Sequence, residues 1–341
     1  MIISNERTNK LKILIRNLSN LNFINDVIII DKKHLIFHQE NSGQNQMEYF
    51  IGNNLVSNNN ILNFKENINN NKFLSEKYSF KYCHLICQAK EIACSNIFEN
   101  STGVALHSLS RDFLFDDSVI YPQLTIDDFY LGDMHNNNDG ALKHIVTTLE
   151  KLDLLYLIPK LNIKYMEKSR KNGDLDIKIG SSSYEKYIVS INNCMEAVNL
   201  CSTREFLSGN SGDLKYFYNA SAVLNQRLVL FADSFVAFHL NIWGSFFKEI
   251  IYIRNAFIFE DVIFSLKPDV VVTSNTERYL LNVPKGNYKR PFFLSLLKKG
   301  IMKSAFDDYT YNFITDLFSM DKSSFIRKVD LKYKPEKFGN A

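Results

Sequence analysis

One stretch in the last third of the chain constrains the fold most, because strand-like and helix-like segments alternate there. An apolar run at 227–231 has the composition of a buried parallel strand. Two further runs of this kind lie at 249–254 and 269–273, with a helical segment at 257–266 between them. This alternation is typical of α/β proteins. We therefore expect a doubly wound parallel sheet flanked by helices.

Ser234 follows the first of these strands, in the sequence Phe-Ala-Asp-Ser-Phe at 231–235, and residues 236–247 can form a helix. A serine at such a turn lies at the carboxyl edge of the sheet, where open α/β folds bind ligands. The amino end of the helix also offers backbone N–H groups to an oxyanion. Taken alone, Ser234 is more often a cap or turn residue, and Asp233 is best explained as the cap of the next helix.

A second polar segment, Gly-Asp-Met-His at 132–135, places a carboxylate and an imidazole two positions apart. A serine hydroxyl needs a base to act as a nucleophile, and imidazole both takes and returns a proton near neutral pH. We therefore predict a catalytic triad of Ser234 as nucleophile, His135 as base and Asp133 as the residue that orients the imidazole. The alternative is that His135, which precedes three asparagines, is an exposed loop histidine. The backbone N–H of Ser234 is the expected first oxyanion donor, and the sequence identifies no second.

Composition excludes some classes of function. The 341 residues suffice for one large core or two modest ones, and a net charge of +3 does not indicate nucleic-acid binding. Basic residues gather after position 285. A solvated helix face explains this cluster best, and peripheral contact with a membrane is the alternative.

No signal peptide and no membrane-spanning run is recognised, and the five cysteines suit a reducing compartment. We therefore expect a cytoplasmic protein, with the inner face of the membrane as a possible location. Cys83, His84 and Cys87 lie close together, but their spacing matches no standard zinc pattern. Core thiols are favoured over a metal site, and we expect no metal.

The order of the polar segments resembles the SGNH-like polysaccharide O-acetyltransferases of the alginate O-acetyltransferase type, over most of the chain. Residues 132–141 are similar to the family's Asp-x-His-Trp-Asn-x-x-Gly-Ala block, residues 172–175 to its Gly-Asp-Leu block, and residues 231–235 to its Gly-Asp-Ser-Phe block. Residues 267–271 with 277–280 resemble its Lys-Pro-Asp-Val-Val…Glu-Arg-x-Leu block.

Two positions depart from these blocks. Ala232 stands where the family has glycine, and Asn136 where it has tryptophan. Near the amino end, the apolar runs 27–30 and 34–37, joined by a polar turn, predict a β-hairpin that resembles the family's entry segment.

The resemblance implies an SGNH-hydrolase-like fold in three parts. Residues 1–73 would be the hairpin and Asn-rich loops packed on the core, residues 74–284 the catalytic domain, and residues 285–341 a basic, aromatic, helical extension.

The resemblance also implies an activity: Ser234, His135 and Asp133 would transfer an acetyl group through an acyl-serine to a hydroxyl of a bacterial surface polysaccharide (capsule, O-antigen or exopolysaccharide) or its precursor. The partners would be that glycan or sugar precursor and glycosyltransferases of the same pathway. In the cytoplasm, acetyl-CoA would be the acyl donor. A carbohydrate esterase or deacetylase with the same triad, and a non-catalytic glycan-binding scaffold on the same fold, remain alternatives.

Overall fold

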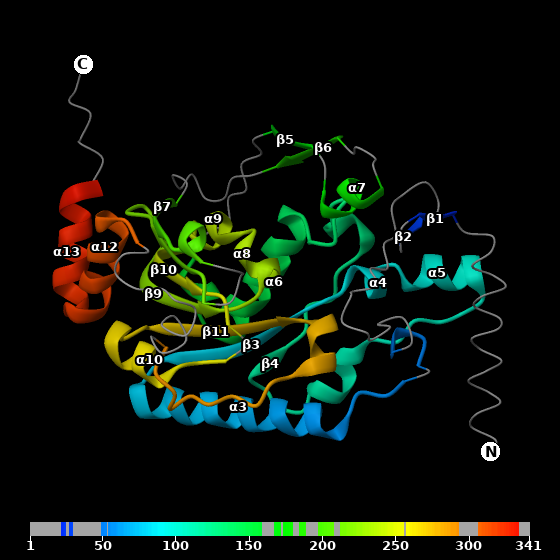
Figure 1. The fold of residues 1–341 in the computed structure, drawn as a ribbon, viewed down its shortest axis with the longest axis horizontal. Helices are drawn as coiled ribbons and strands as arrows, with labels where there is room; N and C mark the ends of the chain where they lie inside the picture. The colour runs from blue at the N-terminus through cyan, green and yellow to red at the C-terminus, as the bar shows by residue number, and fades with distance from the viewer. Residues whose placement is uncertain are drawn as a thin grey trace.

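A seven-stranded sheet is the centre of the computed structural model, which describes residues 22–24, 27–29, 49–52, 54–158, 167–171, 173–179, 184–188, 197–207, 212–255, 257–292 and 306–333. Its strand order is β4-β3-β11-β9-β10-β8-β7 (Figure 1). The strands span β3 (Lys81–Cys87), β4 (Val119–Ile120), β7 (Val198–Ser202), β8 (Leu214–Tyr218), β9 (Leu224–Phe231), β10 (Phe247–Ile253) and β11 (Val270–Thr276).

The sheet is mixed rather than wholly parallel. The five strands from β4 to β10 are parallel to their neighbours, whereas β8 pairs antiparallel with β10 and β7 pairs antiparallel with β8. The α/β prediction is thus confirmed, and the prediction of a parallel sheet is wrong at this edge. Burial alternates along β8 but is continuous over the last five residues of β9, as expected for antiparallel and buried parallel strands respectively.

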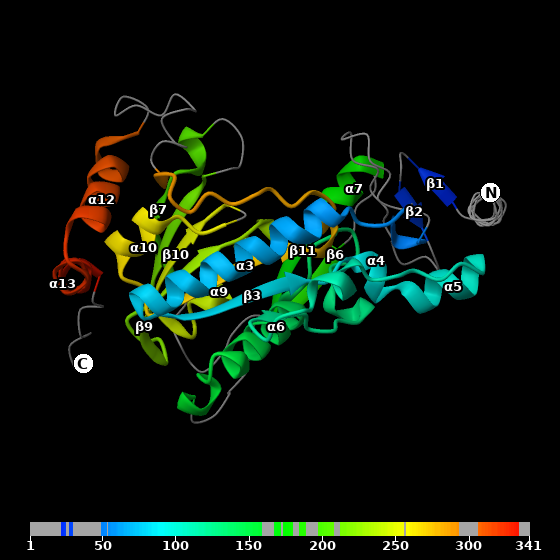
Figure 2. The same cartoon turned by 90° about the horizontal axis from the view of Figure 1, so that it is seen from below.

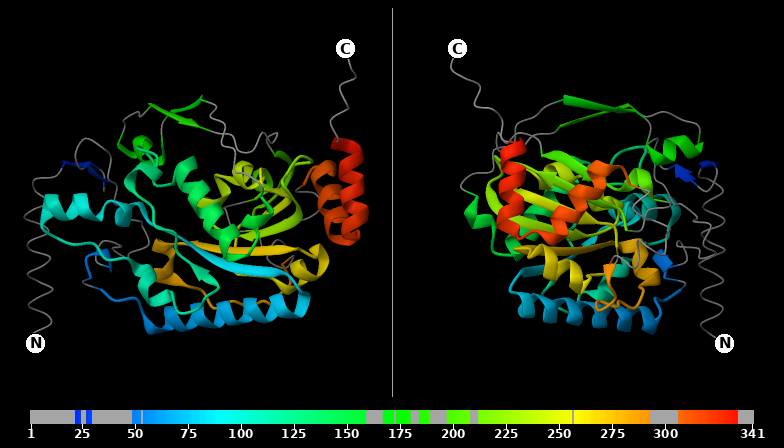
Figure 3. Two further views of the ribbon diagram at one scale, coloured as in Figure 1. Left: turned by 180° about the vertical axis from the view of Figure 1, so that it is seen from behind. Right: turned by 60° about the vertical axis from the view of Figure 1, so that its left-hand side comes forward.

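Helices cover both faces of the sheet. One face packs against α6 (Asn138–Lys151), α8 (Ser234–Ala237) and α9 (Leu240–Trp243). The other packs against α3 (Asn58–Tyr78), α10 (Glu260–Leu266), α12 (Asp308–Ser319) and α13 (Lys322–Tyr333). Figure 2 shows α3 running alongside β3, and Figure 3 shows α12 and α13 side by side at one end of the molecule.

The segment predicted as one helix at 236–247 is instead two helices of four residues, α8 and α9, followed by β10. His239 ends the first helix because its backbone (φ −120°, ψ 22°) leaves the α-helical region. The short α8 holds Ser234 directly against the end of β9.

The remaining elements lie around this core. They are β1 (Asn22–Ile24), β2 (Val27–Ile29), α4 (Lys90–Ala93), α5 (Ser95–Thr102), β5 (Glu167–Lys171), α7 (Asp174–Ile179) and β6 (Tyr184–Ile188), with short 3-10 turns that include η1 (Leu109–Phe113), η2 (Ile126–Asp128) and η5 (Glu277–Asn282).

Strand β2 pairs with β1. Residues 34–37, the second arm of the predicted hairpin, lie outside the described residues, so that hairpin stays a prediction. The predicted tail is helical at α12 and α13, and residues 293–305 are not described. The predicted domain boundaries stay predictions, and the first, at 73, falls within α3. Within the described part of the chain, no helix is long and apolar enough to cross a membrane.

Candidate active site

The carboxyl ends of β3, β9 and β11 meet at one edge of the sheet because these strands are parallel neighbours. Lys90 follows β3, Ser234 follows β9, and Thr276 is the last residue of β11. The loop 129–136, between η2 and α6, supplies Asp133 and His135 at this edge. Such an edge is where open α/β folds bind ligands.

The turn that carries Ser234 is fixed by Asp233. One carboxylate oxygen of Asp233 accepts a hydrogen bond from the backbone N–H of Phe235 (3.0 Å), so Asp233 caps α8 as predicted. Its other oxygen accepts bonds from the backbone N–H and the hydroxyl of Thr276, both at 2.6 Å. The hydroxyl of Tyr252, on β10, donates to the backbone carbonyls of Ala232 and Asp233 (3.2 Å each). Both neighbouring strands therefore hold the turn.

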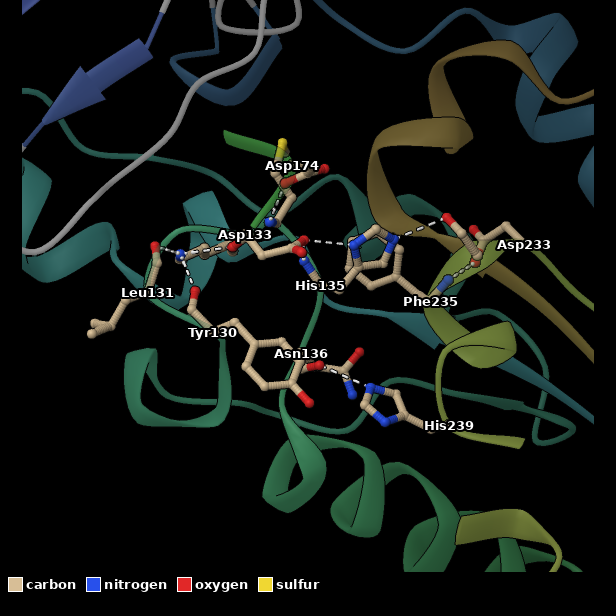
Figure 4. A network of polar contacts seen from close by, with 12 residues as sticks. Tyr130, Leu131, Asp133, His135, Asn136, Asp174, Asp233, Phe235 and His239 are labelled. Atoms are coloured by element: carbon tan, nitrogen blue, oxygen red, sulfur yellow. Dashed lines mark hydrogen bonds and ion pairs between the residues drawn. The ribbon is translucent and has the colours of Figure 1, made fainter. Parts of the chain in front are cut away.

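The structure brings the three predicted triad residues together. His135 Nε2 lies 3.1 Å from Ser234 Oγ, and His135 Nδ1 lies 2.7 Å from Asp133 Oδ1. Figure 4 shows the imidazole between Asp133 and the turn of Asp233. Both contacts are within hydrogen-bond distance, which is the geometry a serine, base and orienting carboxylate require. Whether these residues catalyse a reaction stays a prediction.

Aromatic rings enclose the imidazole of His135, which is only 8% exposed. The ring centroids of Phe235 and Phe238 lie 4.6 and 4.1 Å from that of His135. Phe235 is buried, whereas Phe238 is 50% exposed and forms an apolar surface beside the imidazole. His135 is therefore no exposed loop histidine, and partial exclusion of water strengthens its hydrogen bonds.

The segment Gly173-Asp174-Leu175 supports the loop from outside. The backbone N–H of Leu175 donates to the carbonyl of Gly132 (3.1 Å), and Asp174 Oδ1 accepts from the N–H of Met134 (3.2 Å). A Cβ on Gly173 would lie 1.9 Å from the carbonyl oxygen of Gly132, so only glycine fits here. Desolvation, and then the negative charge of Asp133, raise the pKa of Asp174 to about 6.

Lys90 supports the same loop from inside, and the sequence did not reveal it. Its ammonium donates to the carbonyls of Tyr130 (2.6 Å), Leu131 (2.8 Å) and Asp133 (2.8 Å). The signal available in the sequence was a Lys-Glu pair three positions after the end of an apolar strand, at the edge where Ser234 is also expected.

A second buried charge pair lies at this edge. The guanidinium of Arg278 is 3.8 Å from a carboxylate oxygen of Glu91 and donates to Met134 Sδ (3.2 Å). It also lies 5.6 Å from the ring centroid of Phe235. Arg278 therefore contacts both Met134, which precedes His135, and Phe235, which follows Ser234.

Glu277 does not pair with Arg278. Its carboxylate accepts hydrogen bonds from the backbone N–H groups of Ala89 and Leu109 and from the hydroxyls of Ser108 and Tyr121. Burial raises the pKa of Glu277, and these donors oppose that effect. Glu277 therefore ties the start of α4 and of η1 to the end of β11.

Asn136, His239 and Tyr130 form a polar cluster beneath the loop. Asn136 stands where the sequence block that this chain resembles has tryptophan. His239 Nε2 is 2.8 Å from the Asn136 carbonyl oxygen, and the His239 ring stacks on Tyr130 (Figure 4). Asn136 is fully buried, and α6 begins just after it, capped by the side chain of Asn137.

The possible metal ligands divide into two groups. Cys83 and Cys87 face the α6 side of the sheet, whereas His84 faces α3 and packs on Phe64, so these three do not converge. Among the described residues, ligand atoms of Asp133, His135 and Asp174 lie within 4.8 Å of one another. Hydrogen bonds within this group account for its compactness. That the protein uses no metal stays a prediction.

Comparison with known proteins gives distant likenesses. No protein-family model and no curated protein matches the sequence. Among solved structures, the chain is similar to PatB1 of Bacillus cereus, at 16% identity and a TM-score of 0.48, covering 66% of this chain and 93% of that one. It is also similar to a DHHW family protein from Eubacterium siraeum, at 11% identity and a TM-score of 0.48, covering 77% of this chain and 94% of that one. A third similar structure is the O-acetyltransferase domain of Pseudomonas putida AlgJ, at 12% identity and a TM-score of 0.39, covering 72% of this chain and 93% of that one. Likenesses this distant do not assign a function, so the residues of the site must carry it.

Proposed function

We propose that this protein is a serine-dependent O-acyltransferase that moves an acetyl group to a hydroxyl of a bacterial surface polysaccharide or its precursor. The observation that carries the proposal is the line of hydrogen bonds from Ser234 Oγ through His135 to Asp133. The acetyl group and the glycan acceptor follow from the sequence resemblance.

The first half-reaction acylates the enzyme. His135 Nε2 takes the hydroxyl proton of Ser234 while Oγ attacks the carbonyl carbon of the donor. Asp133 stabilises the resulting imidazolium through Nδ1. The tetrahedral intermediate then collapses, the bond to the donor's leaving group breaks, and His135 returns the proton to that group. The backbone N–H of Ser234, at the amino end of α8, would stabilise the negative oxygen.

The second half-reaction transfers the acyl group. His135 takes the proton of the acceptor hydroxyl, whose oxygen attacks the acyl-serine, and the ester bond to Ser234 breaks as Oγ regains a proton. The exposed ring of Phe238 beside His135 offers an apolar surface for the acceptor. In a cytoplasmic protein acetyl-CoA would be the donor, and glycosyltransferases of the same pathway would supply or use the acceptor.

Intact mass spectrometry tests the acyl-enzyme directly. After incubation with acetyl-CoA or p-nitrophenyl acetate, the wild type should gain the mass of one acetyl group, and Ser234→Ala should not. Ser245→Ala, which changes a buried serine elsewhere in the chain, is the control and should be acylated normally. Acylation of Ser234→Ala to the wild-type level would refute the proposal.

The acceptor distinguishes transfer from hydrolysis. Adding surface glycan or sugar precursors to p-nitrophenyl acetate should yield acetylated sugar and less free acetate. Acetate release that no sugar diverts would instead identify an esterase. Unchanged glycan acetylation in cells carrying Ser234→Ala would favour the non-catalytic scaffold.

A further inference from the structure

We propose that Lys90 is a positioning residue for the acyl transfer, because its ammonium sets the path of the loop that carries Asp133 and His135. This inference rests on the proposed function for its kinetic consequence, but its structural consequence is measurable without turnover.

Lys90 is unusual among the lysines of the described chain in the depth of its burial, with 1% of the residue exposed. It is the first residue of α4, three positions after the end of β3. The three carbonyls it contacts belong to residues 130, 131 and 133, which are close together in one loop. An ammonium has three N–H donors, and these three contacts use all of them.

The converging carbonyls explain why a cation is needed. Three carbonyl oxygens directed at one buried point repel one another unless positive charge lies between them. Because these three acceptors are all backbone oxygens of one loop, Lys90 fixes the course of the chain rather than the rotamer of one side chain. One of these oxygens belongs to Asp133 itself, whose carboxylate holds the His135 imidazole.

Two backbone hydrogen bonds hold other parts of this loop. The Tyr130 N–H donates to the His135 carbonyl (3.2 Å), and the Leu175 N–H donates to the Gly132 carbonyl (3.1 Å). These bonds close the loop on itself and hold its outer side. Without Lys90 we expect a loop that is present but displaced. A displacement of about 1 Å at reacting groups lowers the rate about 10²-fold.

Lys90→Met removes the charge but keeps an unbranched apolar side chain of similar length. We expect kcat to fall about 10²-fold with KM within about twofold, because the loss concerns geometry at the reacting groups. Lys81→Met is the matched control: Lys81 also donates to loop carbonyls, those of Leu152 (2.6 Å) and Asp153 (3.4 Å), but after α6 and away from the site. Its kcat should stay at the wild-type level.

Proton NMR reports the positioning without any reaction. The proton between His135 Nδ1 and Asp133 should give a downfield resonance, assigned by its loss in Asp133→Asn. We expect Lys90→Met to lose or shift this resonance, and Lys81→Met to keep it. If the resonance depends on Lys90 while Ser234→Ala shows no loss of function, the proposed function fails and the positioning role stands.

A rescue experiment separates positioning from general stability. Lys90→Ala leaves a space lined by the three carbonyl oxygens. Ethylammonium fits this space and supplies three N–H donors and a positive charge, whereas ethanol supplies one donor and no charge. Activity and the downfield resonance should return with ethylamine, in a saturable manner, and not with ethanol. Two results would overturn the proposal: wild-type kcat in Lys90→Met, or an activity loss in Lys90→Ala that neither amine nor stabilising salt reverses.

Discussion

Asp233 and Thr276 are joined by two hydrogen bonds, since one carboxylate oxygen of Asp233 accepts from both the N–H and the hydroxyl of Thr276. The same side chain caps α8 through the N–H of Phe235. Asp233 therefore couples the turn before Ser234 to the end of the neighbouring strand β11.

Asp233→Ala should affect both stability and rate. Loss of the cap lowers the free energy of unfolding by about 1–2 kcal/mol, and release of the turn from β11 should lower kcat at least about tenfold. Urea unfolding and steady-state kinetics measure the two effects. Asp307→Ala, which removes the cap of α12, is the control and should change stability alone. Equal activity in both variants would contradict the coupling.

Asp133→Asn should lower kcat by about 10⁴-fold, the size of effect seen when the orienting aspartate of a triad becomes an amide. The amide presents an N–H to His135 Nδ1 and so favours the tautomer that cannot accept the Ser234 proton. Asp213→Asn changes another buried carboxylate, which lies 3.7 Å from Lys215, and serves as the control. A Asp133→Asn variant that keeps a tenth of the activity would argue against the triad.

Gly173→Ala should reduce activity more than stability. The added Cβ would lie 1.9 Å from the Gly132 carbonyl oxygen and 2.8 Å from the Asp133 Cβ, so the loop must move. We expect a kcat loss of about 10²-fold. Gly286→Ala creates a milder clash, 2.5 Å from the side-chain oxygen Oδ1 of Asn67, far from the loop in sequence. Matching kinetics for the two variants would mean that the loop tolerates the displacement.

His144→Leu should flatten the pH dependence of stability on the acid side. Burial lowers the pKa of His144 from 6.5 to about 3. Between these values the unfolded chain binds a proton that the folded chain does not, so stability falls as the pH decreases from 6.5 towards 3. The slope is about 1.4 kcal/mol per pH unit for one such group.

The comparison is made by urea unfolding at about pH 7.5 and about pH 5. His144→Leu should lose about 2 kcal/mol less than the wild type over this interval. His84, whose pKa burial also lowers to about 3, should still contribute a loss in both proteins. Identical losses would show that His144 is protonated in the folded state.

The sequence could predict what depends on local pattern. The strands around 227–231 and 269–273 are continuous apolar runs, and the Asp233 cap follows from a polar residue before a helix. The position of Ser234 at the sheet edge follows from the strand before it. The contact of His135 with Ser234 joins residues 99 positions apart. The chemistry of the residue types and the order of the resembled blocks suggested it, whereas no local pattern did.

What the sequence could not predict depends on long-range contact. The antiparallel edge arises because β8 pairs with β10 rather than with β9, its neighbour in sequence, and no local pattern encodes that choice. From the sequence alone, Lys90 resembles an ordinary surface lysine. Its burial and its three carbonyl acceptors are visible only in the folded chain. The need for glycine at position 173 likewise arises only in the folded chain, where its backbone lies against that of Gly132.

Strand β3 pairs with β11 across a long interval of chain, since His84 and Thr273 are register partners 189 residues apart. At a synthesis rate of roughly 5–20 residues per second, β11 is made about 10–40 s after β3. Throughout that interval the open edge of β3 needs protection from other chains. Because the Ser234 turn is tied to the last residue of β11, the moment at which a nascent chain gains the proposed activity would report when β11 has joined the sheet.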